Sequence, residues 1–409
     1  MLRDAVSPLA EREFRLLFAA RLTSFLGSAI APVALAFAVI DDLDGTASEL
    51  GIVLAAGFVP QVIFTLVGGV IADRLPRHLV LVGSDLVSGA AQIVAAALLL
   101  AGAAELWHLA VVQVVRGAAS SVFFPASTGL VPQTVPDRLL QQANALLRMT
   151  MNTSFVVGAA LGGVLVAVAG SGWALAFDGV TYLASAAFLL AMRIAGTVRV
   201  PATFVAELRE GWTEFRSRQW LWVIVVAALV GNMCSSGARQ VLGPVVADRA
   251  LGGATAWGTI LAFQSVGLIV GGVAALRLRP RRPLLVGVVG LFLWGVTIPG
   301  LALELPVMAI AALGLIGGVG VELFGVYWDT ALQQHVPRHA LSRVSSYDAL
   351  GSIVAIPIGL AVAGPVADGI GVSTTLWVSF ALMTAAVAGA LLSRDVRTLP
   401  RREAEPEPA

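Results

Sequence analysis

Four charged side chains stand inside long apolar runs of this sequence, where a charge requires a chemical reason. They are Arg21, Arg116, Arg239 and Glu322. An ionisable residue in a membrane-crossing segment is costly, and it usually faces the protein interior or a water-filled cavity. A carboxylate that loses its hydration takes up a proton more readily, whereas a neighbouring guanidinium favours its ionised form. Glu322 is therefore our leading candidate for proton chemistry, with Arg116 as its expected neighbour. The alternative is a permanent ion pair between the two that only orients the helices.

Two further acidic residues lie in or beside apolar runs. Asp178 stands in the sixth run, and Asp348 stands at the start of the eleventh. Either carboxylate is a second candidate for carrying a proton. The alternative for both is an interfacial position, in which the carboxylate only caps a helix end.

Twelve runs of mostly apolar residues must position these groups. Each run has about twenty residues, which is the length of a helix that crosses a bilayer core about 30 Å thick. Hydrophobic residues make up 58% of the 409 residues and charged residues only 12%. That charged fraction is about half the value usual for soluble domains. Because helices satisfy their own backbone groups in lipid, we predict an all-α membrane protein with 12 transmembrane helices. The predicted spans are 15–40, 50–72, 79–102, 107–130, 145–169, 173–193, 219–244, 255–276, 283–302, 306–328, 346–366 and 372–392.

Arginines mark alternate gaps between these runs. All 26 basic residues are arginine, and they gather before the first run, after each even-numbered run and after the last. The other gaps carry acids such as Asp41, Asp42 and Glu105, with Arg249 as their one clear arginine. Positive residues stay on the cytoplasmic side of a membrane. We therefore expect both termini in the cytoplasm and a multi-pass protein of the inner (plasma) membrane.

Two stretches of the first half recur in the second half. The segment 68–77 resembles 271–281, which lies 203 residues later, and 135–139 resembles 336–340, which lies 201 residues later. Parallel repeats of this kind build transporters that rock about a midplane site; the alternative is a chance match between glycine- and arginine-rich helix ends. We predict six-helix bundles at 1–193 and 219–393, a cytoplasmic linker at 194–218 and a cytoplasmic tail at 394–409.

The linker has its own pattern. Phe204, Leu208, Trp212 and Phe215 recur at helical spacing, with charged residues between them. This pattern predicts a short amphipathic helix on the cytoplasmic face. We expect it to tether the bundles rather than to regulate them.

The loop after the second run carries a motif of glycine, aspartate and two arginines. Gly69, Asp73, Arg74 and Arg77 match the Gly-x3-Asp-Arg-x2-Arg pattern of the major facilitator superfamily, and the whole chain resembles that family. Further stretches at 14–18, 123–126, 143–146 and 208–211 resemble its drug-efflux group, which contains macrolide-efflux proteins and the bacterial enterobactin exporter. The resemblance implies the major facilitator fold and a role for the motif in latching one transport state. Retention of topology by positive charge alone is the alternative.

A second motif lies in the fifth run. Gly158, Gly162 and Gly163 resemble the glycine-rich sequence of antiporters in this family, although the usual proline is missing. Small residues also allow transmembrane helices to approach closely. Close packing is therefore the alternative to an antiport signature.

The resemblance further implies that spans one, four, seven and ten line a central cavity. Three arginines against one glutamate predict a basic cavity, which suits an anionic organic molecule. Asn152 and Asn232 are the better polar candidates for contacts, because a buried amide in lipid needs a partner. The predicted cavity residues are Arg21, Arg116, Arg239, Asn152, Asn232 and Glu322.

Together these features predict a secondary active transporter. We expect proton-coupled efflux by antiport of a small organic molecule, such as a drug, macrolide, siderophore or other natural product. An importer or facilitator of the same fold is the first alternative. A membrane-embedded enzyme is the second, but the sequence lacks a His-Glu-x-x-His helix and a nucleotide-binding loop.

The expected partners follow from this interpretation. They are a small-molecule substrate, protons and the lipid bilayer, with no nucleic acid, no metal and no cofactor. We expect a monomer. The lone Cys234 excludes a disulfide within the chain.

Overall fold

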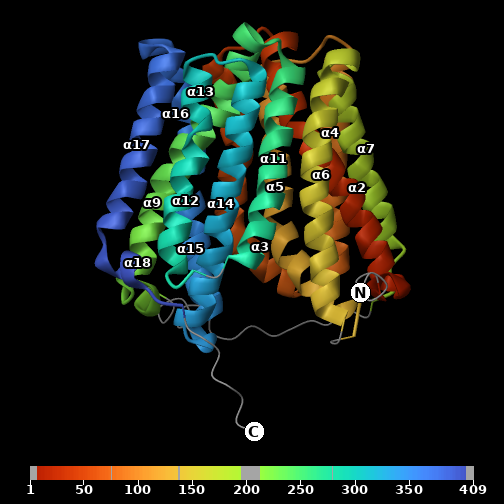
Figure 1. Cartoon of the computed structure of the whole chain (residues 1–409). Coiled ribbons are helices and arrows are strands. Elements are labelled where there is room, and N and C mark those ends of the chain that lie inside the picture. Colours follow the sequence, from red (N-terminus) through yellow and green to blue (C-terminus); the bar gives the residue numbers. More distant parts are fainter. Residues whose placement is uncertain (1–6, 75, 137–138, 195–211, 279, 402–409) are drawn as a thin grey trace. The chain divides into compact units, whose positions relative to one another are not determined.

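The computed structural model of this chain is built from helices that are long and apolar enough to cross a membrane (Figure 1). The structure describes residues 7–74, 76–136, 139–194, 212–278 and 280–401. Among these residues there are 12 candidate membrane spans, and the described elements are helices without a strand. The predicted all-α fold with 12 membrane helices is therefore confirmed.

The first six spans are formed by six long helices with short caps and connections. Their bounds are η1 (Ser7–Ala10), α2 (Arg12–Phe37), η2 (Ala38–Asp42), α3 (Ala47–Arg74), α4 (Arg77–Leu100), α5 (Leu106–Leu130), η3 (Val131–Gln133), α6 (Leu140–Ala169) and α7 (Ser171–Leu190). Only Gly170 separates α6 from α7, and its φ of 88° lies in a region that glycine adopts without a Cβ clash.

The remaining spans are more often interrupted. Their bounds are α9 (Gln219–Ser236), η5 (Gly237–Leu242), α10 (Gly243–Val246), η6 (Ala247–Leu251), α11 (Ala254–Arg277), α12 (Pro283–Gly295), α13 (Thr297–Ala302), α14 (Val307–His335), α15 (Arg338–Ile353), α16 (Ile356–Ile370), α17 (Val372–Leu392) and α18 (Arg394–Thr398). The π-helical turns η5 and η6 lie inside the seventh span. Residues 354–355 break the helix between α15 and α16, and Pro357 stands in the first turn of α16, where its missing N–H leaves no bond to the preceding turn.

Some helices extend beyond their predicted spans. The tenth span was predicted to end at residue 328, but α14 continues to His335; the eleventh was predicted to begin at 346, but α15 begins at Arg338. Charged and polar residues can continue a helix into water, so hydropathy marks the membrane segment and not the helix end.

The chain divides into two compact units. The first unit comprises Met1–Ala202, Arg239–Ala262 and Leu360–Val372, and the second comprises Thr203–Ala238, Phe263–Gly359 and Ser373–Ala409. The predicted boundaries of the two bundles at 193 and 219 remain predictions, because a division by contacts does not follow chain order.

Glycines bring the same pair of spans together in each half of the chain. A Cβ on Gly117 of α5 would lie 1.9 Å from the carbonyl oxygen of Gly57 on α3. A Cβ on Gly318 of α14 would lie 2.2 Å from the carbonyl oxygen of Gln264 on α11. Gly318 follows Gly117 by 201 positions, the offset seen between the repeated sequence stretches. This match supports the predicted internal repeat.

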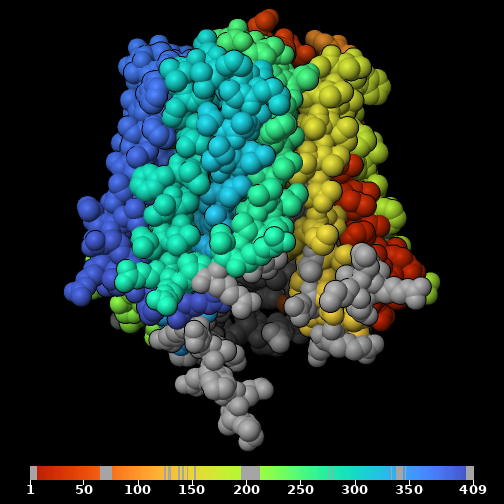
Figure 2. All heavy atoms as spheres, viewed as in Figure 1, coloured from red at the N-terminus to blue at the C-terminus, as the bar shows by residue number. Residues whose placement is uncertain are grey.

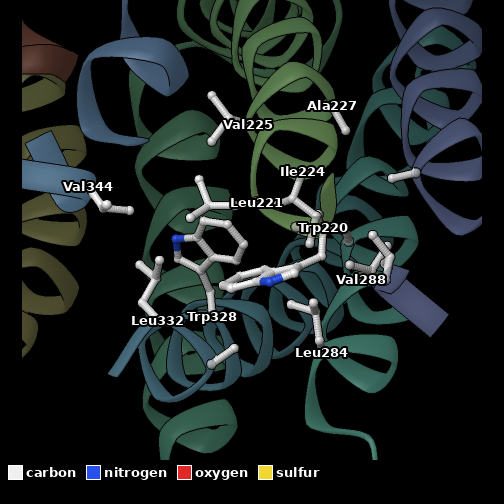
Figure 3. Close-up of a cluster of buried hydrophobic side chains, with 14 of the residues drawn as sticks. Trp220, Leu221, Ile224, Val225, Ala227, Leu284, Val288, Trp328, Leu332 and Val344 are labelled. Atoms are coloured by element: carbon white, nitrogen blue, oxygen red, sulfur yellow. The ribbon is translucent and has the colours of Figure 1, made fainter. Parts of the chain in front are cut away.

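The second unit has a compact apolar core. Trp220 of α9 and Trp328 of α14 meet edge to face with ring centroids 5.6 Å apart, and Ile224, Leu284 and Val288 surround them (Figure 3). Each of these five side chains is at most 6% exposed. Aromatic pairs in this geometry add to the stabilisation from burial, so the core fixes the orientation of both indoles.

The outer surface carries many exposed apolar side chains. On α6, whose yellow side chains face the viewer in Figure 2, Val157, Leu161, Val164 and Val168 are all exposed. Large exposed apolar surfaces mark contact with membranes or partners. With 12 spans, this surface belongs to a multi-pass membrane protein.

Most of the predicted linker helix, 195–211, lies outside the described residues. Its last turn at 212–216 is helical. Trp212 and Phe215 stack with ring centroids 5.6 Å apart, and Trp212 also contacts Tyr347 of α15 at 5.4 Å. These contacts support the interpretation of this turn as a tether on the second unit.

Candidate functional site

A buried ion pair lies in the middle of the first unit. Arg116 of α5 approaches Asp178 of α7, with 3.5 Å between Nη2 and Oδ2. The Asp178 side chain has no solvent exposure, and the Arg116 side chain is 17% exposed. Both residues lie near the centres of their helices, so the pair lies well away from both helix ends. A charge in such a place is retained only when it is paired.

Polar side chains from four helices surround the pair. Gln92 of α4 donates from Nε2 to Asp178 Oδ2 at 2.6 Å. Tyr182 of α7 exchanges a hydrogen bond of 2.9 Å with Ser28 of α2, and the Arg116 guanidinium lies 5.8 Å from the Tyr182 ring centroid. The network thus joins α2, α4, α5 and α7. Partners from several helices hold the carboxylate in one orientation.

One oxygen of Asp178 lacks a hydrogen bond. Asp178 Oδ1 is buried and has no hydrogen-bond partner among the described residues. It faces α2, since a Cβ added to Gly27 would lie only 2.7 Å from it. A buried acceptor without a partner is energetically unfavourable. Protonation of the carboxyl group removes its charge and supplies an O–H donor.

Two more buried charges, on Arg21 and Asp85, lie in the same unit. Arg21 of α2 interacts electrostatically with Asp85 of α4, donates from Nη2 to Ser127 Oγ, and lies 4.1 Å from the Phe123 ring centroid. Asp85 is fully buried and accepts a hydrogen bond of 2.6 Å from Ser185 Oγ. The first unit therefore holds two buried arginine–aspartate associations, each formed between different helices.

The structure places the carboxylate of Asp178 beside Arg116. Glu322 belongs to the second unit, and its predicted approach to Arg116 remains a prediction. Glu322 lies on α14, where its side chain faces the paired glycines of α11. A Cβ on Gly271 would lie 2.9 Å from the Glu322 Cβ, and a Cβ on Gly272 would lie 3.7 Å from Glu322 Oε1. The internal repeat predicted how deep in the membrane Glu322 lies. It gives no information on the direction in which the Glu322 side chain points from α14.

The predicted polar residues of the second unit form hydrogen bonds within it. Trp328 Nε1 donates to Asp348 Oδ2 at 2.9 Å, so this carboxylate is a partly buried acceptor between α14 and α15. Asn232 Nδ2 donates to the backbone oxygen of Ser352 at 2.9 Å. The amide of Asn232 thus has the partner that its position in lipid requires.

The other predicted residues are less completely described. Arg239 is buried in the π-helical turn η5, with 9% exposure. Gly69, Asp73 and Arg74 belong to the last turns of α3, and the side chains of this segment lie outside the described residues, as does that of Asn152 on α6. Arg77 begins α4. The latch assigned to this motif therefore remains a prediction.

The three antiporter-like glycines all lie at close helix contacts. A Cβ on Gly158 would lie 2.4 Å from Ala29 Cβ of α2, and a Cβ on Gly162 would lie 3.2 Å from the Cα of Ile30 on the same helix. A Cβ on Gly163 would lie 2.7 Å from the backbone oxygen of Ala254, in the part of α11 that belongs to the first unit. This geometry supports the close-packing interpretation of the motif.

Sequence reasoning overlooked Asp85, Gln92 and Tyr182. All three stand in predicted spans, so the rule that marked Arg116 would also have marked Asp85. Gln92 and Tyr182 carry no charge, and their importance depends on lateral contacts with Asp178 and Ser28. No spacing within one helix reveals such contacts.

Comparison with known proteins finds transporters that are similar to this chain over most of its length. Residues 17–352 match the family model of the Major Facilitator Superfamily. Macrolide efflux protein A of Streptococcus pyogenes is 23% identical over 404 residues, covering 95% of this chain and 97% of that protein. Multidrug efflux pump Tap of Mycolicibacterium fortuitum is 25% identical over 396 residues, covering 93% of this chain and 95% of that protein.

Solved structures agree on the fold. The crystal structure of the nucleoside transporter NupG superimposes with a TM-score of 0.73 at 13% identity, covering 93% of this chain and 97% of that chain. A bacterial homologue of the human lysosomal transporter Spinster gives a TM-score of 0.73 at 15% identity, covering 96% of this chain and 99% of that chain. At such identities the likeness concerns the fold alone.

Proposed function

We propose that this chain, which belongs to the Major Facilitator Superfamily, exports a small organic molecule in exchange for protons. That it is a multi-pass membrane transporter and not an enzyme follows from the family. The proposed direction, out of the cell, rests on two efflux proteins that are similar to this chain over almost their full length. A macrolide or another amphipathic drug is therefore the first substrate class to test. An importer or a facilitator remains the competing function.

The observation that carries the proton coupling is the Arg116–Asp178 pair. Asp178 has one oxygen held by Gln92 and the guanidinium, and a second buried oxygen without a hydrogen bond among the described residues. When Arg116 is close, the ionised carboxylate is favoured; when Arg116 withdraws, the protonated form is favoured. A movement of α5 relative to α7 would then load or release one proton.

Glu322 stands second in this proposal. Glu322 and Asp329 are the acidic residues of α14, and Glu322 packs against the glycines of α11. Its position is compatible with a coupling role. Because Asp178 is fully buried, is paired with Arg116 and accepts from Gln92, we assign the proton to Asp178 and treat Glu322 as the competing assignment.

The membrane orientation belongs to the same proposal. The arginines before the first span and after the even-numbered spans favour an orientation in the plasma (inner) membrane with both termini in the cytoplasm. The working unit in this proposal is the monomer.

Transport into inside-out vesicles tests the direction. The chain would be expressed in a bacterial host without its own drug pumps, and vesicles acidified by respiration would be given a labelled macrolide and a panel of amphipathic drugs. Export predicts accumulation in these vesicles, and nigericin should abolish it by collapsing the pH gradient. Accumulation only in right-side-out vesicles would establish an importer, and equilibration without accumulation would establish a facilitator.

A further inference from the structure

A cavity of about 300 Å³ lies within the second unit, between α9, α12, α14, α15 and α17. Its walls are mostly aliphatic, and three aromatic side chains, Trp294, Phe324 and Trp328, line it. Its polar lining comes from Asn232, Asp348 and Ser352. Ligand sites combine apolar walls with a few placed polar groups in this way. The volume lies at the lower end of the range for such sites, which restricts the occupant to about one ring and one small polar group.

The charge of this cavity is negative. Asp348 is the charged residue among the described lining residues, which include no arginine or histidine. Trp328 Nε1 and Ser352 Oγ donate to the carboxylate, at 2.9 Å and 3.4 Å respectively. Both donors are neutral, so they orient the carboxylate without cancelling its charge. Asp329, which interacts electrostatically with Asp348, adds further negative charge.

The aromatic faces reinforce this preference. Phe324 and Trp328 are stacked with ring centroids 5.9 Å apart and planes inclined by 17°. Trp220 fixes Trp328 from the core side (Figure 3). The faces of aromatic rings attract cations, most strongly when water is excluded. A carboxylate beside two rigid rings is the arrangement that binds a large organic cation.

We propose that this cavity binds a small organic cation, an aromatic or aliphatic ammonium group, with Asp348 as its counter-ion and Trp294, Phe324 and Trp328 around it. Within the proposed export function, the cavity would hold a cationic substrate or the cationic arm of a larger one, and to that extent the inference rests on that function. It differs from the sequence-based expectation of an anionic substrate, which was drawn from arginines that the structure places elsewhere.

Equilibrium binding to the purified chain in lipid nanodiscs tests the proposal without any transport. The probe is tritiated benzyltrimethylammonium, which has one ring and a permanent positive charge, and it is measured by scintillation proximity. Two unlabelled compounds of similar shape serve as competitors: neutral neopentylbenzene and anionic phenylmethanesulfonate. We expect saturable binding of the cation, weak competition by the hydrocarbon and none by the sulfonate.

The variants assign the site. Asp348→Asn keeps an oxygen that can accept from Trp328 and removes the charge, so we expect the affinity to fall at least about tenfold. Phe324→Leu should weaken binding several-fold by removing a ring. Asp395→Asn is the matched control, because Asp395 is an exposed acid of α18 outside the cavity, and it should leave the affinity unchanged.

Several results would overturn the proposal. They are an absence of saturable binding, an unchanged affinity in Asp348→Asn, or equal competition by the sulfonate. If Asp348→Asn fails to fold, the competition series on the unaltered chain and the Phe324→Leu variant still decide. The binding assay uses no gradient and measures no transport, so its result is independent of the transport assay. An absence of cation binding would overturn this inference and leave the proposed proton-coupled export untouched.

Discussion

The Arg116–Asp178 pair predicts a specific thermodynamic coupling between two substitutions. Arg116→Gln removes the positive charge and leaves Asp178, which has no solvent exposure, without its cation. Removing one partner of a buried pair costs about 3–5 kcal/mol. The separation of 3.5 Å and the 17% exposure of Arg116 place this pair near the lower limit, so we expect a loss of about 3 kcal/mol in the free energy of unfolding.

The reverse substitution should cost less. Asp178→Asn leaves Arg116 with Gln113 Oε1 at 3.0 Å and with partial exposure to solvent. We expect a loss of about 2 kcal/mol. In the double variant neither charge is left alone, and the loss should be no larger than that of Arg116→Gln alone. The coupling energy is then about 2 kcal/mol, which is well above the error expected for independent sites.

Reversible unfolding in mixed detergent micelles measures these free energies for the four proteins of the cycle. A second cycle combines Arg116→Gln with Glu322→Gln and should give additive losses within about 0.5 kcal/mol. Additive losses in the first cycle, or a coupling in the second cycle but not in the first, would refute the assignment of Asp178 as the partner of Arg116.

Two further predictions concern packing and the buried charges of Arg21 and Asp85. Gly117→Ala should strongly destabilise the protein, because the added Cβ would lie 1.9 Å from the Gly57 carbonyl oxygen. The control Gly389→Ala adds a Cβ that meets nothing within 4 Å, and it should leave the melting temperature unchanged. Equal melting temperatures of the two variants would contradict the close contact of α3 and α5. Arg21→Ala should lower stability more than Arg21→Ala combined with Asp85→Ala, since the single substitution leaves a fully buried carboxylate without its cation. A double variant less stable than the single one, by the same melting assay, would show that the two residues do not act as a pair.

The membrane architecture was predictable because it depends on composition alone. Each span is a run of apolar residues of the length that a bilayer requires. The break between α15 and α16 was not predicted, since residues 346–366 were expected to form one uninterrupted span and Pro32, Pro60 and Pro365 lie inside helices without ending them. Helix ends beyond the membrane, such as His335 of α14, were not predictable, because polar residues can lie in a helix or a loop with similar ease.

The candidate site was predictable only in part. The positions of Arg116 and Asp178 as buried charges followed from the cost of a charge in lipid. Their pairing did not, since it depends on which faces of α5 and α7 meet. Asp348 illustrates the same limit: the sequence indicated a helix cap or a proton carrier, whereas its contacts with Trp328 and the adjoining cavity depend on the rotation of α14 against α15.

Proton movement driven by substrate tests the central claim of this account most directly. The protein would be reconstituted into liposomes containing a pH-sensitive dye, and a transported drug would be added on one side in the absence of any other gradient. We predict proton movement opposite to the drug in the unaltered protein, and drug exchange without proton movement in Asp178→Asn. Proton movement that persists in Asp178→Asn and disappears in Glu322→Gln would contradict the account and transfer the coupling role to Glu322.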